Sequence, residues 1–114
     1  MAAFEIQYLN YQYTKRDALI LMDADKEPFL SMTQVWAGVL AIRNDTAGRT
    51  FVTDWLACCM NRDILMDTPS VLAPEHDGFI AHRHGQSVLS ILMKKYNFLP
   101  VRNDWSAGFM HPTG

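Results

Sequence analysis

The sequence of 114 residues has little that would direct it to a membrane, to secretion or to nucleic acid. No apolar run approaches the roughly 20 residues that a bilayer crossing requires. The N-terminus, MAAFEIQYLNY, lacks the basic and apolar regions of a signal peptide. There is no long basic segment and the formal net charge is -2, which excludes strong binding to nucleic acid or anionic membranes through bulk charge. We therefore expect a cytoplasmic protein without a membrane span.

Cysteine is also scarce, and the sequence has no internal repeat. The two cysteines, Cys58 and Cys59, are adjacent, and adjacent cysteines rarely form a disulfide. Together with the missing signal peptide, this pair indicates a reduced, intracellular protein. The length is enough for one domain with one core.

What the sequence does contain is the material for a core. Apolar residues make up 49% of the chain, with three Trp and seven Met, which excludes a disordered chain. The segment QVWAGVLAI, around residues 35–42, is rich in β-forming residues and ends at a turn signal, so it predicts a central strand. Gly38 inside this strand indicates a close approach by another part of the chain. The first ten residues fit either a strand or an irregular lead-in.

Two helices are predicted from the spacing of apolar residues. Residues 46–61 have an apolar stripe formed by Phe51, Trp55, Leu56 and Cys59. Residues 86–96 have an inner stripe formed by Val88, Leu89, Leu92, Met93 and Tyr96. Between them, residues 63–81 contain proline and glycine without periodicity, which predicts an ordered loop. With a last short strand expected over residues 98–101, the fold class is α/β.

The segment before the predicted central strand is ambiguous. Thr14 and Asp17 have the spacing of a capping box that would begin a helix over residues 15–22. The apolar run ALILM in this segment equally fits a buried strand, because so few residues do not separate the two periodicities. Lys15, Arg16 and Asp17 form a charged triplet. This triplet would either bind phosphate at the rim of a pocket or form the polar first turn of a helix.

The densest polar segment is HRHGQS, which opens the second predicted helix. A helix N-terminus has free N–H groups and a partial positive charge, so it is a natural site for an anion. His82 and His84 would lie on one side of an extended backbone, where imidazoles bind zinc or manganese and Asp77 adds an oxygen ligand. His111 is a further candidate ligand. The alternative is that these groups hold the loop to the helix by hydrogen bonds.

Two neighbouring carboxylates offer another candidate metal site. Asp23 and Asp25 follow an apolar run and suit a divalent cation that bridges a nucleotide diphosphate. The same residues also fit a solvated, charged turn that ends before Pro28.

The first turn of the second helix holds groups that suit a sugar phosphate. The Gln86 amide would bond a sugar hydroxyl or steady a developing oxocarbenium charge, or else cap the helix. The rigid fork of donors on Arg83 suits a phosphate oxygen. Its alternative role is a surface ion pair with Glu75 or Asp77.

Four segments, taken in order, resemble a known family: YTKRDALILMDAD, QVWAGVLAIRN, FVTDWLACCMNRDILMDTPS and HRHGQSVLSILMKK. They resemble the C-terminal half of a bacterial glycosyltransferase-like family over about residues 8–98. The resemblance implies a GT-A-like mixed sheet, a nucleotide-diphosphate-sugar donor, a glycan acceptor and a divalent metal, Mn or Mg. In similar enzymes an Asp-Gln pair opens a late helix beside the donor sugar, so the resemblance places Gln86 against the reacting face of that sugar.

This interpretation assigns a candidate role to each polar group. The catalytic candidates are Gln86 and His84. The substrate-binding candidates are Lys15, Arg16, Asp17, Gln34, Trp36, His82 and Arg83. The metal candidates are Asp23, Asp25 and His111.

The chain departs from the family pattern in two ways. The family's Asp in the HRHDQ motif is Gly85 here, which removes a carboxylate from the site. The resemblance also leads us to expect that the nucleotide-binding half, which precedes YTKRD in the family, is missing here. We therefore expect residues 1–114 to form a single partial domain, a fragment or remnant of a glycosyltransferase that is inactive alone.

Two other functions fit the same residues. One is a non-catalytic module that binds a sugar or a partner, and that self-associates through a sheet edge left open by the missing half. The other is a small metal-dependent hydrolase that uses His82, His84 and Asp77.

Overall fold

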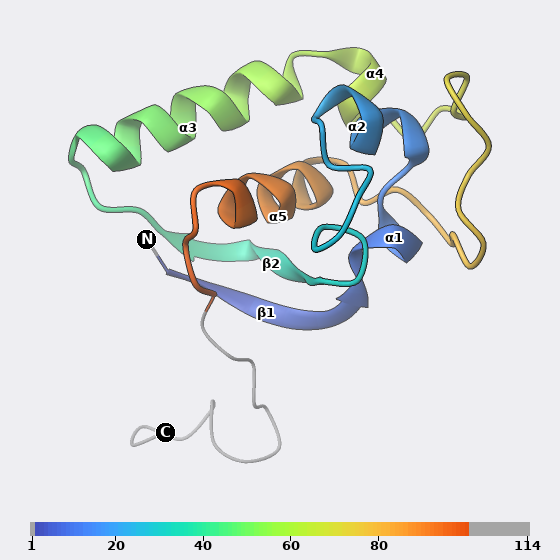
Figure 1. Cartoon of the computed structure of the whole chain (residues 1–114). Coiled ribbons are helices and arrows are strands. Elements are labelled where there is room, and N and C mark those ends of the chain that lie inside the picture. Colours follow the sequence, from blue (N-terminus) through green and yellow to red (C-terminus); the bar gives the residue numbers. More distant parts are fainter. Residues whose placement is uncertain (1, 101–114) are drawn as a thin grey trace.

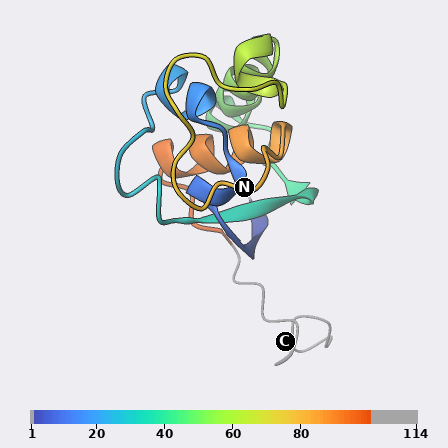
Figure 2. The ribbon, with the colours of Figure 1, turned by 90° about the vertical axis from the view of Figure 1, so that its right-hand side faces the viewer.

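The computed structural model describes residues 2–100 and shows an α/β fold arranged in three layers (Figure 1). A two-stranded antiparallel sheet forms one layer, and helix α5 lies on it. The remaining long helix, α3, and the short helices α2 and α4 lie on the other side of α5, an arrangement that the turned view in Figure 2 also shows. The elements in chain order are β1 (Ala2–Leu9), α1 (Asn10–Tyr13), α2 (Arg16–Leu21), β2 (Thr33–Ala41), α3 (Thr46–Cys59), α4 (Arg62–Leu65) and α5 (Gly85–Lys95).

The sheet confirms the strand predicted around residues 35–42 and makes the first residues a strand. The register pairs Ala3 with Leu40 and Phe4 with Trp36, with an irregularity between these two pairs. Within residues 2–100, β2 pairs only with β1, so a second neighbour that would make it a central strand is not found in this part of the chain. Residues 98–100 form no strand either, because Phe98 instead packs on Phe51 and Tyr96. Val101 lies outside the described residues.

Helix α5 forms the centre of the core because it is covered on both sides. Its buried apolar residues are Val88, Leu89, Ile91, Leu92 and Met93. Two serines on the same helix are also buried, and they bond the neighbouring elements: the Ser87 hydroxyl donates to the Tyr13 carbonyl, and the Ser90 hydroxyl accepts from the Val35 N–H. The predicted inner stripe is therefore confirmed, and it is wider than the usual face of an amphipathic helix.

Helix α3 lies where it was predicted, but one residue of its predicted apolar stripe does not face the core. Phe51 is fully buried and Trp55 is half-buried, whereas Leu56 is 60% exposed. The spacing of apolar residues predicted Leu56 to be buried, but spacing alone does not determine which side of the helix packs on the core. Asp45 caps the N-terminus of the helix, because its carboxylate accepts from the Gly48 N–H.

The ambiguous segment is a helix, but the capping box that was expected to begin it is wrong. Lys15 is the N-cap residue of α2 and makes no side-chain cap bond. The Thr14 hydroxyl donates to Asn10, and the Asp17 carboxylate accepts from the N–H groups of Val71 and Leu72. Both side chains are therefore used for tertiary contacts.

The predicted loop over residues 63–81 is irregular apart from its beginning, where the short helix α4 was not expected. The Asn61 side chain accepts from the Asp63 N–H and caps the N-terminus of this single turn. None of the helices in the described residues has the length and apolarity that a bilayer crossing requires.

Candidate functional site

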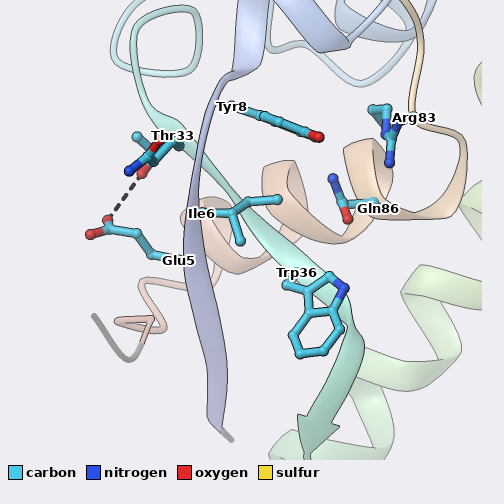
Figure 3. A pocket seen from close by; sticks show the side chains of 8 residues that line it. Glu5, Ile6, Tyr8, Thr33, Trp36, Arg83 and Gln86 are labelled. Carbon is cyan, nitrogen blue, oxygen red and sulfur yellow. Dashed lines mark hydrogen bonds between the residues drawn. The ribbon is translucent and has the colours of Figure 1, made fainter. Parts of the chain in front are cut away.

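A cavity lies where the two strands meet the N-terminal end of α5 (Figure 3). Its volume is about 590 Å³, within the range of roughly 300–1,000 Å³ that small-molecule sites occupy. Three of the predicted site residues, Trp36, Arg83 and Gln86, line it. The other lining residues are Glu5, Ile6, Gln7, Tyr8 and Thr33.

The aromatic part of the cavity is formed by Trp36 and Tyr8. A Cβ atom built on Gly38 would lie 2.4 Å from the Trp36 ring, so glycine at position 38 makes room for the indole. The close approach predicted at Gly38 is thus made by a side chain. Tyr8 stacks on Tyr13, with ring centroids 4.2 Å apart. The cavity therefore presents two aromatic rings, one lying against Gly38 and the other stacked on Tyr13.

Arg83 lies over the Tyr8 ring, with its guanidinium carbon 5.2 Å from the ring centroid. This cation–π contact holds the guanidinium at the cavity edge and leaves its fork of donors available. The alternative ion pairs with Glu75 and Asp77 are not among the salt bridges found in residues 2–100.

The polar part of the cavity is an amide pair. The Gln86 Nε2 donates to the Gln34 Oε1 at 3.0 Å, and the Gln86 Oε1 faces the Ala37 N–H at 3.5 Å. Gln34 is fully buried, whereas Gln86 is half-buried and reaches the cavity. Gln86 does not cap its helix, because its amide bonds β2. Gln34, predicted to bind substrate, instead supports the residue that lines the cavity.

The N-terminal end of α5 offers less to an anion than the sequence suggested. The N–H groups of Gln86 and Ser87 bond the carbonyls of Arg83 and His84, and the Val88 N–H also reaches the His84 carbonyl. The Gly85 carbonyl accepts from the Trp55 indole N–H. The donors that a helix end usually leaves free are thus largely paired within the turn.

The charged triplet Lys15-Arg16-Asp17 fixes the loop over residues 66–84 to the domain. The buried Lys15 ammonium donates to the carbonyl and hydroxyl of Thr68, both at 3.3 Å. The Arg16 guanidinium donates to the Pro74 carbonyl and to Asp25. Lys15 is the N-cap and Arg16 and Asp17 form the first turn of α2, so the alternative of a polar first helical turn is confirmed. None of the three lines the cavity.

The two carboxylates Asp23 and Asp25 do not fit a site for one divalent ion. The Asp25 oxygens contact Arg16 Nε at 2.8 Å and His76 Nε2 at 2.6 Å. Burial is the largest single influence and raises the pKa of this carboxyl. The hydrogen bonds and charges of His76 and Arg16 together outweigh it, so the pKa of Asp25 lies below its usual value. Asp23 is exposed and pairs with Lys26 at 3.4 Å. No cluster of three His, Cys, Asp or Glu side chains able to hold a metal is present in residues 2–100.

His82 is a buried structural residue. Its Nδ1 accepts from the Lys15 N–H at 3.1 Å, and its Nε2 donates to the Ile64 carbonyl at 2.8 Å. Burial lowers its pKa to about 4, so the ring is neutral at pH 7. Because both ring nitrogens already have partners, His82 has no lone pair for a metal.

The remaining histidine candidates are not brought together. His84 is half-exposed, 3.7 Å from Asp67, and has the left-handed φ of 51° at the start of α5. Asp77 is exposed, and His111 lies outside the described residues. His82 agrees with the alternative prediction, in which these groups hold the loop in place by hydrogen bonds.

Sequence reasoning missed the strand β1 as part of the site. Glu5, Ile6, Gln7 and Tyr8 line the cavity from this strand, and the Glu5 carboxylate accepts from the Thr33 hydroxyl at 3.0 Å. In the view of Figure 3 this pair lies on the other side of β1 from Trp36 and Gln86. A signal was available, because a strand beside QVWAGVLAI must present side chains to the same surface.

Comparisons of the chain with models of protein families, with curated proteins and with solved structures find no significant match.

Proposed function

We propose that the cavity binds the hexose of a nucleotide-diphosphate sugar, as the donor site of a glycosyltransferase does. The observation that carries this proposal is that Trp36, Gln86 and Arg83 line one open cavity of about 590 Å³. These three side chains supply different parts of sugar-phosphate recognition. The resemblance of the HRHGQS and YTKRD segments to glycosyltransferase motifs supports the same assignment.

The chemistry of each group suits one part of the ligand. The flat indole of Trp36 packs against the apolar C–H face of a sugar ring. The Gln86 amide bonds a ring hydroxyl and stabilises positive charge that develops at the reacting carbon. The Arg83 fork pairs with two oxygens of a phosphate. The ligand therefore lies with its hexose between Trp36 and Gln86 and its diphosphate toward Arg83.

We propose further that a parent enzyme of this chain transfers the hexose to a glycan acceptor. Glu5 is the one carboxylate among the described residues that line the cavity, and Gly85 stands where the resembling motif has Asp. We propose that this chain retains the binding of the sugar and performs little transfer alone. Self-association through a free edge of the sheet stays a prediction.

Calorimetric titration with UDP- and GDP-hexoses, with and without Mn²⁺, tests this function. We expect binding in the micromolar to millimolar range and a loss of about tenfold, equivalent to about 1.4 kcal/mol, on Arg83→Met. Arg49→Met is the matched control, because Arg49 is exposed on α3 and lies outside this cavity. Gln86→Met should weaken the nucleotide sugar more than the nucleotide alone. Absence of binding at millimolar donor would overturn the proposal.

A further inference from the structure

The buried side-chain amide of Gln34 is held in one orientation, because two of its neighbours can only accept hydrogen bonds. Its Nε2 lies 3.0 Å from the Tyr13 carbonyl oxygen and 3.2 Å from Asn10 Oδ1. A backbone carbonyl only accepts. The Asn10 amide is itself fixed, because its Nδ2 donates to the Phe29 carbonyl at 2.9 Å. The end of Gln34 that faces these groups must therefore be the nitrogen.

Two hydroxyls beside the same nitrogen agree with this orientation. The Thr14 hydroxyl gives its hydrogen to Asn10 Oδ1, and the Ser87 hydroxyl gives its hydrogen to the Tyr13 carbonyl, both at 2.6 Å. Each hydroxyl is then left as an acceptor toward Gln34, at 3.0 and 3.2 Å. If the Gln34 amide turned over, its oxygen would face two fixed acceptors without a shared hydrogen, which is costly in a buried place.

The oxygen of Gln34 therefore faces the Gln86 side chain and requires a donor there. Gln86 satisfies it with one N–H of its amide, at 3.0 Å. This leaves the second N–H of Gln86 and the carbonyl oxygen, whose contact with the Ala37 N–H is long at 3.5 Å. These two groups are the ones that a ligand in the cavity can reach.

We propose that Gln34 is a positioning residue that fixes the orientation of the Gln86 amide, so that the cavity presents one N–H donor and one carbonyl acceptor to the ligand. Such a pair matches two neighbouring hydroxyls of a sugar, one accepting and one donating. The choice of a hexose as the ligand rests on the proposed function. The orientation of the amide does not, and it is tested without any ligand.

The first test is the direction of the hydrogen bond in the free wild-type protein. Nuclear magnetic resonance detects scalar coupling across a hydrogen bond from the donor nitrogen to the carbonyl carbon of the acceptor. We expect coupling from the Gln86 side-chain nitrogen to the Gln34 side-chain carbonyl carbon. Coupling in the reverse direction, or no coupling between the two amides, would overturn the proposal.

The second test replaces the donor by a group that titrates. In Gln86→Glu the introduced carboxyl faces the Gln34 oxygen, so it must keep its proton to make the bond. We expect its pKa to lie at least about one pH unit above that of the carboxyl introduced by Gln7→Glu. Gln7 lines the same cavity but is exposed and serves as the matched control. Equal pKa values for the two variants would contradict the fixed orientation.

A third test separates this effect from simple burial of the introduced carboxyl. Adding Gln34→Met to Gln86→Glu removes the acceptor oxygen and keeps residue 86 at the same place in the fold. The raised pKa of the introduced carboxyl should then fall toward that of Gln7→Glu. A pKa that stays raised would show that burial alone is responsible and would overturn the proposal. If the double variant does not fold, the coupling measurement on the wild type still decides.

The ligand supplies a final and separable readout. Binding of a nucleotide hexose to Gln86→Glu should weaken about tenfold or more as the introduced carboxyl ionises, whereas wild-type binding should show no such step. If the coupling is observed but no nucleotide sugar binds to the wild type, the proposed function fails and the positioning role of Gln34 stands. If the nucleotide sugar binds but its affinity for Gln86→Glu does not change as the introduced carboxyl ionises, the proposed role of Gln34 in ligand recognition fails.

Discussion

The cavity beside α5 and the contacts that hold the loop over residues 66–84 use opposite chemistry. The loop is fixed by charged or titratable side chains, among them Lys15, Arg16 and Asp17, and each of them has a partner inside the protein. The cavity is lined mainly by uncharged side chains, among them two aromatic rings and two amides, and its charged residues are Glu5 and Arg83. In this protein, dense charge in the sequence marks places where the fold is held together. The groups left for a ligand are sparser and lie on elements far apart in the chain.

The largest expected effect concerns the loop contacts and is a dependence of stability on pH. Burial lowers the pKa of His82 from 6.5 to about 4. The unfolded chain therefore binds more protons than the folded one between these values, and stability must fall as the pH falls through this window. We expect a loss of roughly 3 kcal/mol in the free energy of unfolding from above pH 7 to pH 4.

Urea unfolding at a series of pH values measures this loss. In His82→Gln the part of the slope between pH 6.5 and 4 that comes from this residue should disappear. His84→Gln is the matched control, because His84 is half-exposed and should leave the slope in place. A wild-type stability that stays flat through this window would show that His82 is not buried as described.

Removing the Asp17 carboxylate should be the next largest effect. Asp17→Ala deprives the N–H groups of Val71 and Leu72 of an anionic acceptor, which we expect to cost about 2 kcal/mol of unfolding free energy. Asp23→Ala should change stability by less than about 0.5 kcal/mol, since Asp23 is exposed. Asp17→Ala should leave the affinity for the nucleotide sugar nearly unchanged in the folded protein, because Asp17 lies outside the cavity lining. A large loss of affinity would mean that the loop and the cavity act as one site.

Gly38→Ala breaks the cavity while leaving the loop contacts untouched. The added methyl group would lie 2.4 Å from the Trp36 ring and must displace it. We expect about a tenfold loss of nucleotide-sugar affinity, equivalent to about 1.4 kcal/mol, and a shift of the Trp36 indole resonance. Gly85→Ala is the control, because a methyl group there meets no atom within 4 Å. An unchanged indole resonance in Gly38→Ala would contradict the packing of Trp36.

The smallest effect is expected from Gly85→Asp, which restores the carboxylate of the resembling motif. The site is open and is the first residue of α5, where a negative charge should stabilise the helix by about 0.5 kcal/mol. If the sugar site is intact, affinity for the nucleotide sugar should also rise a few-fold. Gly85→Asn has the same size without the charge and should reproduce neither gain. A loss of affinity with Gly85→Asp would mean that position 85 does not face a sugar site.

The sequence predicted those elements that have a clear local signal. Helices α3 and α5, with the buried stripe of α5, follow from the spacing of apolar residues, and strand β2 follows from its β-forming residues and the turn signal after them. Leu56 was misplaced because spacing does not say which neighbours a helix will meet. The short helix α4 was missed because a single turn has no period to detect.

The site was predictable only where its residues cluster in the chain. Arg83 and Gln86 stand in a dense polar segment and were found, whereas Tyr8 lies in β1 and reaches the cavity only through strand pairing. Lys15 and His82 were assigned to ligands because sequence shows a polar group but not its partner. Their partners, Thr68 and Ile64, are far away in sequence and are brought near by the fold.

The most direct measurement is a map of backbone and side-chain resonances during titration with a nucleotide hexose. We expect shifts at Trp36, Arg83 and Gln86, and none of comparable size at Arg16 or His76, which hold the loop. Shifts that concentrate on Arg16 and His76, or a complete absence of shifts at millimolar ligand, would contradict the claim that the cavity beside α5 is the sugar site.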